Sequence, residues 1–378
     1  MFTRQKFYQV FQIIPFIFTK SEIQNNYGLI FSMLFKNSDY NLVMRNGVKI
    51  SIPNSSFLTL IDLFNALRQS VYYNIDDNGF MEISFDFKNK FSLNLRKLDQ
   101  ESKNLLHIFH ACLRYGGNII TIEDKETIQN EKVFRVYKKN DKQIIETYDG
   151  VKFYLKNFVG GIIESWVMGI HMMNQNENFE NKVVVDVGAS VGDTPLYYAS
   201  KGAKVYAFEI DERSYNQMLE NIELNPQYSN HIVPINGGIG SDELITYFTV
   251  QRNEGLIGAY GIDTSATSFS SHFNDVNAEK HTSQGYTLES AYKKFDISSI
   301  DLLKMDCKGC EFTITENDLK NVKSIKIEYN KYKDSHKIEN LLELLRNSGF
   351  HYRLFKHIPD EIKSFNDSGN IYAYKKTD

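Results

Sequence analysis

Asp186, Gly188 and Gly192 are the residues of this chain whose types and spacing most clearly permit chemistry. They lie in residues 183–194, VVVDVGASVGDT, whose valines predict a buried strand that runs into a glycine turn and a helix. The glycines remove side chains where backbone and ligand must approach closely. A dinucleotide fingerprint requires G-x-G-x-x-G, but Ser190 stands where the second glycine should be. The pattern therefore predicts a cofactor turn of another kind, with an acid two residues before its first glycine.

This D-x-G-x-x-x-G spacing resembles motif I of methyltransferases that depend on S-adenosylmethionine (SAM). Glu209 lies 17 residues after Gly192 and ends the next predicted strand, where an acid can accept hydrogen bonds from both ribose hydroxyls. A solvated glutamate at a strand end is the alternative. Asp193 and Thr194 open the first helix, where free amides favour an anionic group such as the cofactor's carboxylate. The glycine cluster 236–240 after the third strand either contacts the adenine edge or forms an ordinary turn.

The fourth predicted strand lies in residues 301–311, DLLKMDCKGCE, and ends among four charged side chains, Lys304, Asp306, Lys308 and Glu311. This segment resembles the FkbM-type family of SAM-dependent methyltransferases, whose signature reads roughly K-I-D-x-E-G-x-E. The residues on family positions are Lys304, Asp306, Gly309 and Glu311. Lys308 departs from the family, because an ammonium replaces the central glutamate, and the substrate specificity is expected to differ accordingly.

The resemblance implies methyl transfer from SAM to an oxygen, commonly a hydroxyl of a sugar, polyketide or similar small molecule. A methyl group on a sulfonium is already activated, so catalysis is chiefly alignment plus a base that removes the hydroxyl proton. The implied catalytic residues are Asp306, Lys308 and Glu311, with either acid as the base and Lys308 binding a negative or polar substrate group. The implied cofactor-binding residues are Asp186, Gly188, Ala189, Gly192, Asp193, Thr194, Glu209, Asn236 and Gly237.

Strands alternate with helices from Asn181 onward, which predicts an α/β fold with helices on both faces of a mostly parallel sheet. The expected fold is the Rossmann-like seven-stranded methyltransferase sheet with its last strand antiparallel. Helices are predicted from about Asp193 to Lys201, Glu212 to Leu224 and Ile338 to Arg346, the last followed by a left-handed Gly349. The predicted strands are VVVDV, KVYAFEI, IVPIN, IDLLKMD, SIKIEYN, HYRLFKH and NIYAYKK.

Residues 1–145 contain no glycine-rich cofactor loop and are expected to form an α+β accessory domain of unknown role. Residues 146–378 are the predicted catalytic domain, and the charged stretch Lys138 to Glu146 is the predicted linker. Two turns, Asn46-Gly47 and Asp149-Gly150, precede strand-like segments in the same way, which indicates either a faint internal repeat or, as we favour, two ordinary turns.

Composition excludes more than it identifies. The chain of 378 residues has a net charge of −4 and no basic stripe, so nucleic acid is not favoured as a partner. Three cysteines cannot form a disulfide framework, and a cytoplasmic location is expected. The apolar segment Phe7 to Phe18 is too short to span a bilayer and is expected to be a buried strand or helix. The acceptor and the oligomeric state cannot be read from the sequence, and a homo-oligomer remains open.

Cys307 and Cys310 form a C-x-x-C motif for which neither zinc nor redox chemistry is expected. The chain has no second cysteine pair to complete a metal site, and a charged strand end does not suit a thioredoxin-like motif. Glu328, which ends the strand SIKIEYN, either points into the same cleft or pairs with Lys326. His171, on an apolar helical stretch with Glu164 and Trp166, is expected to be a packed core histidine.

The polar stretch from Gln251 to Gly285 is long enough for a lid, with Ser270, Ser271 and His272 as candidate substrate contacts. His107, His110 and Cys112 can share one helix face, which favours helix packing over a metal site. Two alternatives to a small-molecule enzyme stay open. One is a non-catalytic SAM-binding module, which the lysine within the signature favours. The other is an RNA-modifying methyltransferase whose N-terminal domain binds RNA.

Overall fold

The computed structural model describes residues 10–11, 13–15, 17–18, 23–35, 39–53, 57–84, 90–95, 99–115, 118–121, 133–157, 159–171, 178–251, 257–260, 278–331, 335–356 and 364–375. The chain divides into two compact units, of which the first contains Met1–Met168 and the second most of Gly169–Asp378. None of the helices within these described ranges is long and apolar enough to cross a membrane.

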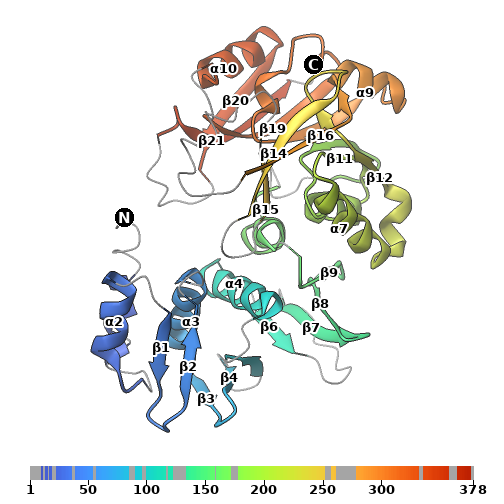
Figure 1. Ribbon diagram of the computed structural model, residues 1–378. Coiled ribbons are helices and arrows are strands. Elements are labelled where there is room, and N and C mark those ends of the chain that lie inside the picture. The colour runs from blue at the N-terminus through green and yellow to red at the C-terminus, as the bar shows by residue number, and fades with distance from the viewer. Residues whose placement is uncertain are drawn as a thin grey trace. The chain divides into compact units, whose positions relative to one another are not determined.

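The first unit is an α+β arrangement of short sheets and three main helices (Figure 1). The helices are α2 (Asn26–Phe35), α3 (Phe57–Gln69) and α4 (Gln100–Tyr115). A hairpin is formed by β1 (Tyr40–Val43) and β2 (Lys49–Ile52), and a three-stranded sheet by β3 (Tyr72–Ile75), β4 (Phe80–Ser84) and β5 (Lys90–Asn94). A four-stranded sheet contains β6 (Asn118–Thr121), β7 (Val133–Lys139), β8 (Lys142–Glu146) and β9 (Lys152–Tyr154). This unit ends in α5 (Gly160–Ile162) and the π-helix η2 (Ile163–Met168).

Several expectations for this part of the chain can be compared with the structure. The predicted linker Lys138 to Glu146 is wrong, because the end of β7 and the whole of β8 form an antiparallel hairpin there. The consecutive side chains of Ile144 and Ile145 point to opposite faces of the strand and are both buried, so this charged stretch is packed into the sheet. His107 and His110 do share a face of α4, and both contact the Asp62 carboxylate, at 3.1 and 2.7 Å.

The second unit is built on a seven-stranded sheet in the order β12-β11-β10-β18-β19-β21-β20 (Figure 1). Every neighbouring pair is parallel except the two that include β21, so β21 alone runs against the other six strands. The strands are β10 (Val183–Val187), β11 (Lys204–Glu209), β12 (Ile232–Asn236), β18 (Ile300–Met305), β19 (Val322–Asn330), β20 (Phe350–Phe355) and β21 (Ser368–Lys375). The predicted seven strands and the antiparallel last strand are therefore confirmed.

The strands and helices of this sheet form for simple reasons. Val185, Leu303 and Ile325 lie side by side on three adjacent strands and are fully buried, since an apolar run suits a strand that is covered on both faces. The helices α6 (Asp193–Ser200), α7 (Glu212–Glu223), α9 (Leu288–Lys294) and α10 (Ile338–Asn347) connect the strands. Gly349 follows α10 with a φ of 81°, which confirms the predicted left-handed residue after that helix.

An additional antiparallel sheet lies in the stretch for which a lid was predicted. It contains β14 (Ile245–Gln251), β15 (Ile257–Tyr260) and β16 (Ala278–Ser283), in the order β15-β14-β16. The prediction of a continuous polar loop from Gln251 to Gly285 is wrong at these strands, because β16 pairs with β14 over six residues. The candidate contacts Ser270, Ser271 and His272 lie outside the described residues. A two-residue parallel bridge joins β13 (Gly238–Ile239) to β17 (Gly285–Tyr286).

Candidate functional site

The turn after β10 depends on glycine at two positions. Gly188 has a φ of 85°, and a Cβ placed on it would overlap the backbone carbonyl of Asp306 on the neighbouring strand end. Gly192 has a φ of 86° and lies just before α6, where a Cβ would come within 2.9 Å of Met218 Cγ. Ser190 is also left-handed, with a φ of 49°. Glycine is therefore required at both motif positions by conformation and by close packing.

Asp186 and Lys304 form a buried ion pair beneath this turn. Lys304 Nζ lies 2.9 Å from Asp186 Oδ1 and donates a hydrogen bond to the Gly188 carbonyl oxygen at 3.0 Å. The Thr194 hydroxyl donates to the second carboxylate oxygen of Asp186. Burial opposes the charge on Lys304, but the carboxylates of Asp186 and Asp306 outweigh it and raise the pKa of Lys304. Lys304 thus holds β10, the glycine turn and β18 together.

Glu209 lies at the end of β11, and both of its carboxylate oxygens accept hydrogen bonds from backbone amides. Oε2 accepts from Ser190 N at 2.7 Å, and Oε1 accepts from Asp211 N at 2.9 Å. Burial raises the pKa of Glu209 to about 7, although these two amide hydrogen bonds favour the ionised form. Asn236 is the register partner of Glu209 on β12, and its buried Nδ2 has no hydrogen-bond partner among the described residues. An acid and an unsatisfied amide donor therefore adjoin at one edge of the sheet.

Asp193, the first residue of α6, is a second buried group with unused hydrogen-bonding capacity. Its side chain is 5% exposed, and Oδ1 has no hydrogen-bond partner within the described part of the chain. Burial raises the pKa of Asp193 to about 6; Lys304 opposes this rise, and Asp186 and Asp306 add to it. Gly237, by contrast, is packed against the protein itself, since a Cβ there would lie 2.7 Å from the Tyr286 ring.

A pair of acids shares one lysine at the carboxyl ends of β18 and β19. Lys308 Nζ lies 2.6 Å from Asp306 Oδ1 and 3.7 Å from Glu328 Oε1, and all three side chains are between 27% and 29% exposed. Burial alone would raise the pKa of Asp306, but Lys308 and Lys304 outweigh it and lower that pKa. The pKa of Glu328 is raised, chiefly by the charge of Asp306 and also by burial. Of the two acids, Glu328 is thus the one whose affinity for a proton is increased.

Two further polar side chains extend this region along the sheet. Asn370 on β21 is the register partner of Glu328, is 5% exposed, and has an Oδ1 without a hydrogen-bond partner in the described ranges. Lys326, two residues before Glu328, lies 2.6 Å from His171 Nδ1, and both side chains are buried. The rings of Tyr197 and Tyr198 pack on His171, which places this histidine in a buried aromatic cluster.

Glu311 does not join the acid pair at the strand ends. It is fully buried, its Oε2 accepts from Gly309 N at 2.8 Å, and the same oxygen lies 3.2 Å from Cys307 Sγ. Burial raises the pKa of Glu311 to about 7. Cys307 and Cys310, for which neither zinc nor redox chemistry is expected from the sequence, are joined by a disulfide.

The structure therefore brings the predicted residues together in two groups. One group surrounds the turn after β10 and the ends of β11 and β12, and it contains Asp186, Gly188, Ala189, Gly192, Asp193, Thr194, Glu209, Asn236 and Gly237. The other contains Asp306 and Lys308 at the end of β18. Sequence reasoning named Lys304 and Glu328 without assigning them to the site, and it missed Asn370. Only the strand register places Asn370 beside Glu328, and no local pattern signals it.

The order of the seven strands, with one antiparallel strand between two parallel ones, is that of the Rossmann-like SAM-dependent methyltransferases. The glycine turn after the central strand β10 and the acid at the end of β11 are the features of the site that accompany this sheet. Fold and site together define a methyltransferase domain of this class.

Residues 186–352 match the family described as the methyltransferase FkbM domain. The match begins within β10 and contains the whole of β11, β12, β18 and β19, and with them all residues of the two groups. Asn370, the register partner of Glu328, lies outside the match. The predicted class and its cofactor, SAM, are confirmed by this match. No curated protein sequence matches the chain.

Solved structures give a more distant likeness. Methyltransferase FkbM from Methylobacillus flagellatus KT is 14% identical with a TM-score of 0.36, over 58% of this chain and 53% of that one, so the chain spans about half the length of that protein. Aeropyrum pernix fibrillarin with natively bound S-adenosyl-L-methionine is 9% identical with a TM-score of 0.33, over 80% and 98% of the two chains. M. jannaschii TYW2 in complex with AdoMet is 15% identical with a TM-score of 0.31, over 68% and 95%.

Proposed function

We propose that this protein is a SAM-dependent O-methyltransferase whose acceptor is a hydroxyl group of a small molecule or sugar. Its catalytic domain is the segment predicted from the sequence, residues 146–378. The observation that carries the proposal is the acid pair Asp306 and Glu328, which shares Lys308 at the strand ends beside the glycine turn. Such a pair suits removal of a proton from an oxygen nucleophile.

The buried groups near the glycine turn fit the cofactor. Glu209 lies where ribose hydroxyls would donate to it, because each of its oxygens retains a further lone pair beside its amide hydrogen bond. The unsatisfied Nδ2 of Asn236 can donate to an acceptor nitrogen of adenine. The free Oδ1 of Asp193 suits the α-ammonium of the methionine moiety better than its carboxylate, which would face a second acid. The amides that begin α6 suit that carboxylate.

When bound, the cofactor supplies a methyl group that is already activated by its sulfonium. The chain's residues then have to align the acceptor oxygen and remove its proton. Glu328, whose pKa is raised by Asp306 and by burial, accepts the proton as the new oxygen–carbon bond forms and the carbon–sulfur bond breaks. Asp306 stays ionised because Lys308 and Lys304 lower its pKa. Lys308 and the free Oδ1 of Asn370 provide a cation and an acceptor that orient polar groups of the substrate.

The test is transfer of a labelled methyl group from SAM to a panel of sugars, phenols and hydroxy acids. Glu328→Gln should lower kcat by about a hundredfold or more while SAM affinity is retained, since a positioned base contributes about this much. Asp306→Asn should lower kcat less, because it removes only the charge that raises the pKa of Glu328. Glu289→Gln is a matched control, because Glu289 is an exposed acid that pairs with a lysine, Lys293, at 2.7 Å. Full activity in both acid variants, or no methylated acceptor in the panel, would contradict the proposal.

A further inference from the structure

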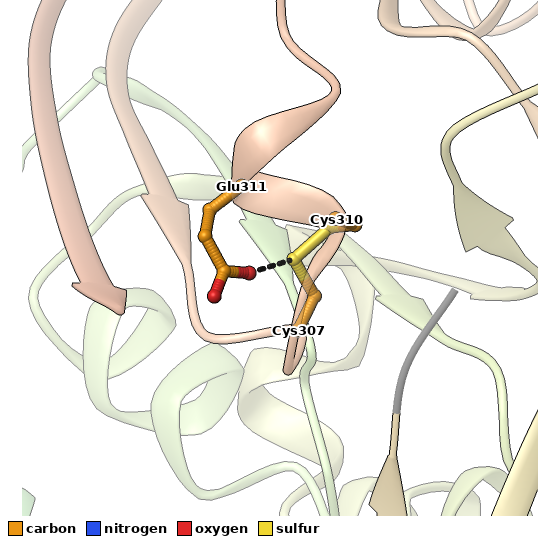
Figure 2. Close-up of side chains that lie close together, drawn as sticks. All are labelled: Cys307, Cys310 and Glu311. Atoms are coloured by element: carbon orange, nitrogen blue, oxygen red, sulfur yellow. Dashed lines mark hydrogen bonds between the residues drawn. A yellow bond between two sulfur atoms is a disulfide. The ribbon is translucent and has the colours of Figure 1, made fainter. Parts of the chain in front are cut away.

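The loop after β18 carries a short disulfide ring. Cys307 and Cys310 are bonded through their sulfurs (Figure 2). Their Cα–Cα distance is 5.5 Å, and by sequence the ring encloses Lys308 and Gly309. Both enclosed residues have positive φ angles, 58° and 132°. The ring therefore occupies the loop whose lysine contacts the acid pair.

The two sulfurs differ in accessibility. Cys310 is 0% exposed, whereas Cys307 is partly exposed. A thiol or disulfide from solution can thus approach Cys307, while Cys310 is reached from within the protein. This division suits thiol–disulfide exchange, in which an accessible thiolate attacks first and a second sulfur resolves the mixed disulfide.

Glu311 supplies a proton acceptor for this pair. Its Oε2 lies 3.2 Å from Cys307 Sγ, as the dashed line in Figure 2 shows, and its Oε1 has no hydrogen-bond partner among the described residues. Burial raises the pKa of Glu311 to about 7, which brings it closer to that of an ordinary thiol. In the reduced protein, Glu311 is therefore placed to take the Cys307 proton and form the reactive thiolate.

We propose that Cys307, Cys310 and Glu311 form a redox-active thiol–disulfide exchange site that reacts with low-molecular-weight disulfides and thiols. In oxidation, Glu311 takes the Cys307 proton, and the thiolate attacks the external disulfide. One sulfur–sulfur bond breaks, a mixed disulfide forms, and the released thiolate takes that proton. Cys310 then loses its proton and attacks Cys307, which closes the ring and releases the second thiol. Two protons and two electrons leave the dithiol, and the external disulfide accepts both.

The redox state of the cysteine pair affects the acid pair Asp306 and Glu328 through Lys308. A lysine at a φ of 58° is in a conformation that non-glycine residues rarely adopt, and the closed ring holds it there while Nζ contacts Asp306 at 2.6 Å. Opening the ring permits the loop to relax and lengthens this contact. This consequence for catalysis rests on the proposed methyltransferase function, whereas the exchange chemistry does not.

The exchange site is tested on the full-length protein equilibrated in glutathione buffers, alkylated and cleaved with trypsin. Cleavage after Lys308 separates residues 305–308 from 309–320, so the disulfide appears as a linked pair of peptides. The linked fraction should follow the ratio of oxidised to reduced glutathione. Cys310→Ser should trap a glutathione mixed disulfide on Cys307, whereas Cys307→Ser should trap none. Cys112→Ser is the matched control, because Cys112 is buried and its thiol pKa is raised to about 12.

Glu311→Gln should slow oxidation of the reduced pair by at least about tenfold near pH 7 without abolishing it, because only the proton acceptor is lost. SAM affinity should be equal in the two redox states, and methyl transfer, where an acceptor is known, should differ between them. A pair that stays reduced at every glutathione ratio, or a mixed disulfide that forms on Cys310, would overturn the proposal. Reduced protein that retains zinc on dialysis and then resists oxidised glutathione would overturn it in favour of a metal site. Absence of methyl transfer with normal exchange would count only against the proposed function.

Discussion

Replacement of Lys304 by methionine is expected to destabilise the second unit strongly. The ion pair with Asp186 has an Nζ–Oδ1 distance of 2.9 Å, and the two side chains are only 6% and 0% exposed. Removing one partner of such a buried pair leaves the other charge uncompensated, which typically costs about 3–5 kcal/mol. The change also removes the hydrogen bond to the Gly188 carbonyl, so the glycine turn should lose its order and SAM affinity should fall.

The assay is urea-induced unfolding followed by circular dichroism. Lys323→Met is the matched control, because Lys323 lies on β19 and pairs with Asp301 at 2.8 Å but is 65% exposed. An exposed pair of this kind contributes only about 0–1 kcal/mol. The double variant Asp186→Asn with Lys304→Met should be more stable than the sum of the single losses predicts, by about 1–3 kcal/mol, because neither charge is left alone.

The charge of Lys304 itself should not change between pH 6 and 9, roughly, since its pKa is raised from 10.5. A group with a raised folded-state pKa contributes stability that is complete below its unfolded value and is lost only as the pH rises through its folded value. Equal losses in Lys304→Met and Lys323→Met, or strictly additive losses in the double variant, would refute the reasoning.

Three further outcomes are expected. Gly188→Ala should destabilise the second unit by several kcal/mol more than Gly349→Ala. Both glycines have φ above 80°, but only at Gly188 does backbone, the carbonyl of Asp306, occupy the place of the new Cβ. Equal unfolding midpoints would be evidence against this close approach. Lys308→Glu, which restores the family residue, should raise the pKa of Asp306 and shift the acid limb of the pH–rate profile of methyl transfer to higher pH. An unshifted profile would show that Lys308 does not act on Asp306. The folded-state pKa of Glu311 is raised from 4.5 to about 7, so its contribution to the free energy of unfolding is complete below pH 4.5 and is lost as the pH rises through 7. Glu311→Gln should abolish that decline in the unfolding midpoint. A parallel decline in both proteins would exclude Glu311 as its source.

The sheet could be predicted from the sequence because its strands are short apolar runs bounded by clear turn residues. Val183 to Val185 and the glycines after them identify strand, turn and helix within a single segment. The hairpin of β7 and β8 was missed because its charged residues drew more attention than its apolar ones, although Phe134 and Val136 on β7 and Ile144 and Ile145 on β8 are buried. The many charged residues of this stretch were misinterpreted as the sign of a linker.

The site was less predictable than the fold, because contacts across strands depend on register. Glu328 was expected either in the same cleft as the end of β18 or beside Lys326 or solvent, and only the structure shows that it lies 3.7 Å from Lys308. Asn370 lies some 40 residues after Glu328 in the sequence and reaches it only through antiparallel pairing of β21 with β19. The cysteine pair could not be interpreted from spacing, since its role depends on the loop that brings Glu311 beside Cys307.

The central claim is tested most directly by calorimetric titration of the whole protein with SAM, S-adenosylhomocysteine and NAD, alongside Glu209→Ala. The account predicts micromolar binding of SAM and S-adenosylhomocysteine, loss of most of that affinity in the variant, and no binding of NAD. Binding of NAD in place of SAM, or SAM binding that is unchanged in Glu209→Ala, would contradict the assignment of this glycine turn and acid as a methyltransferase cofactor site.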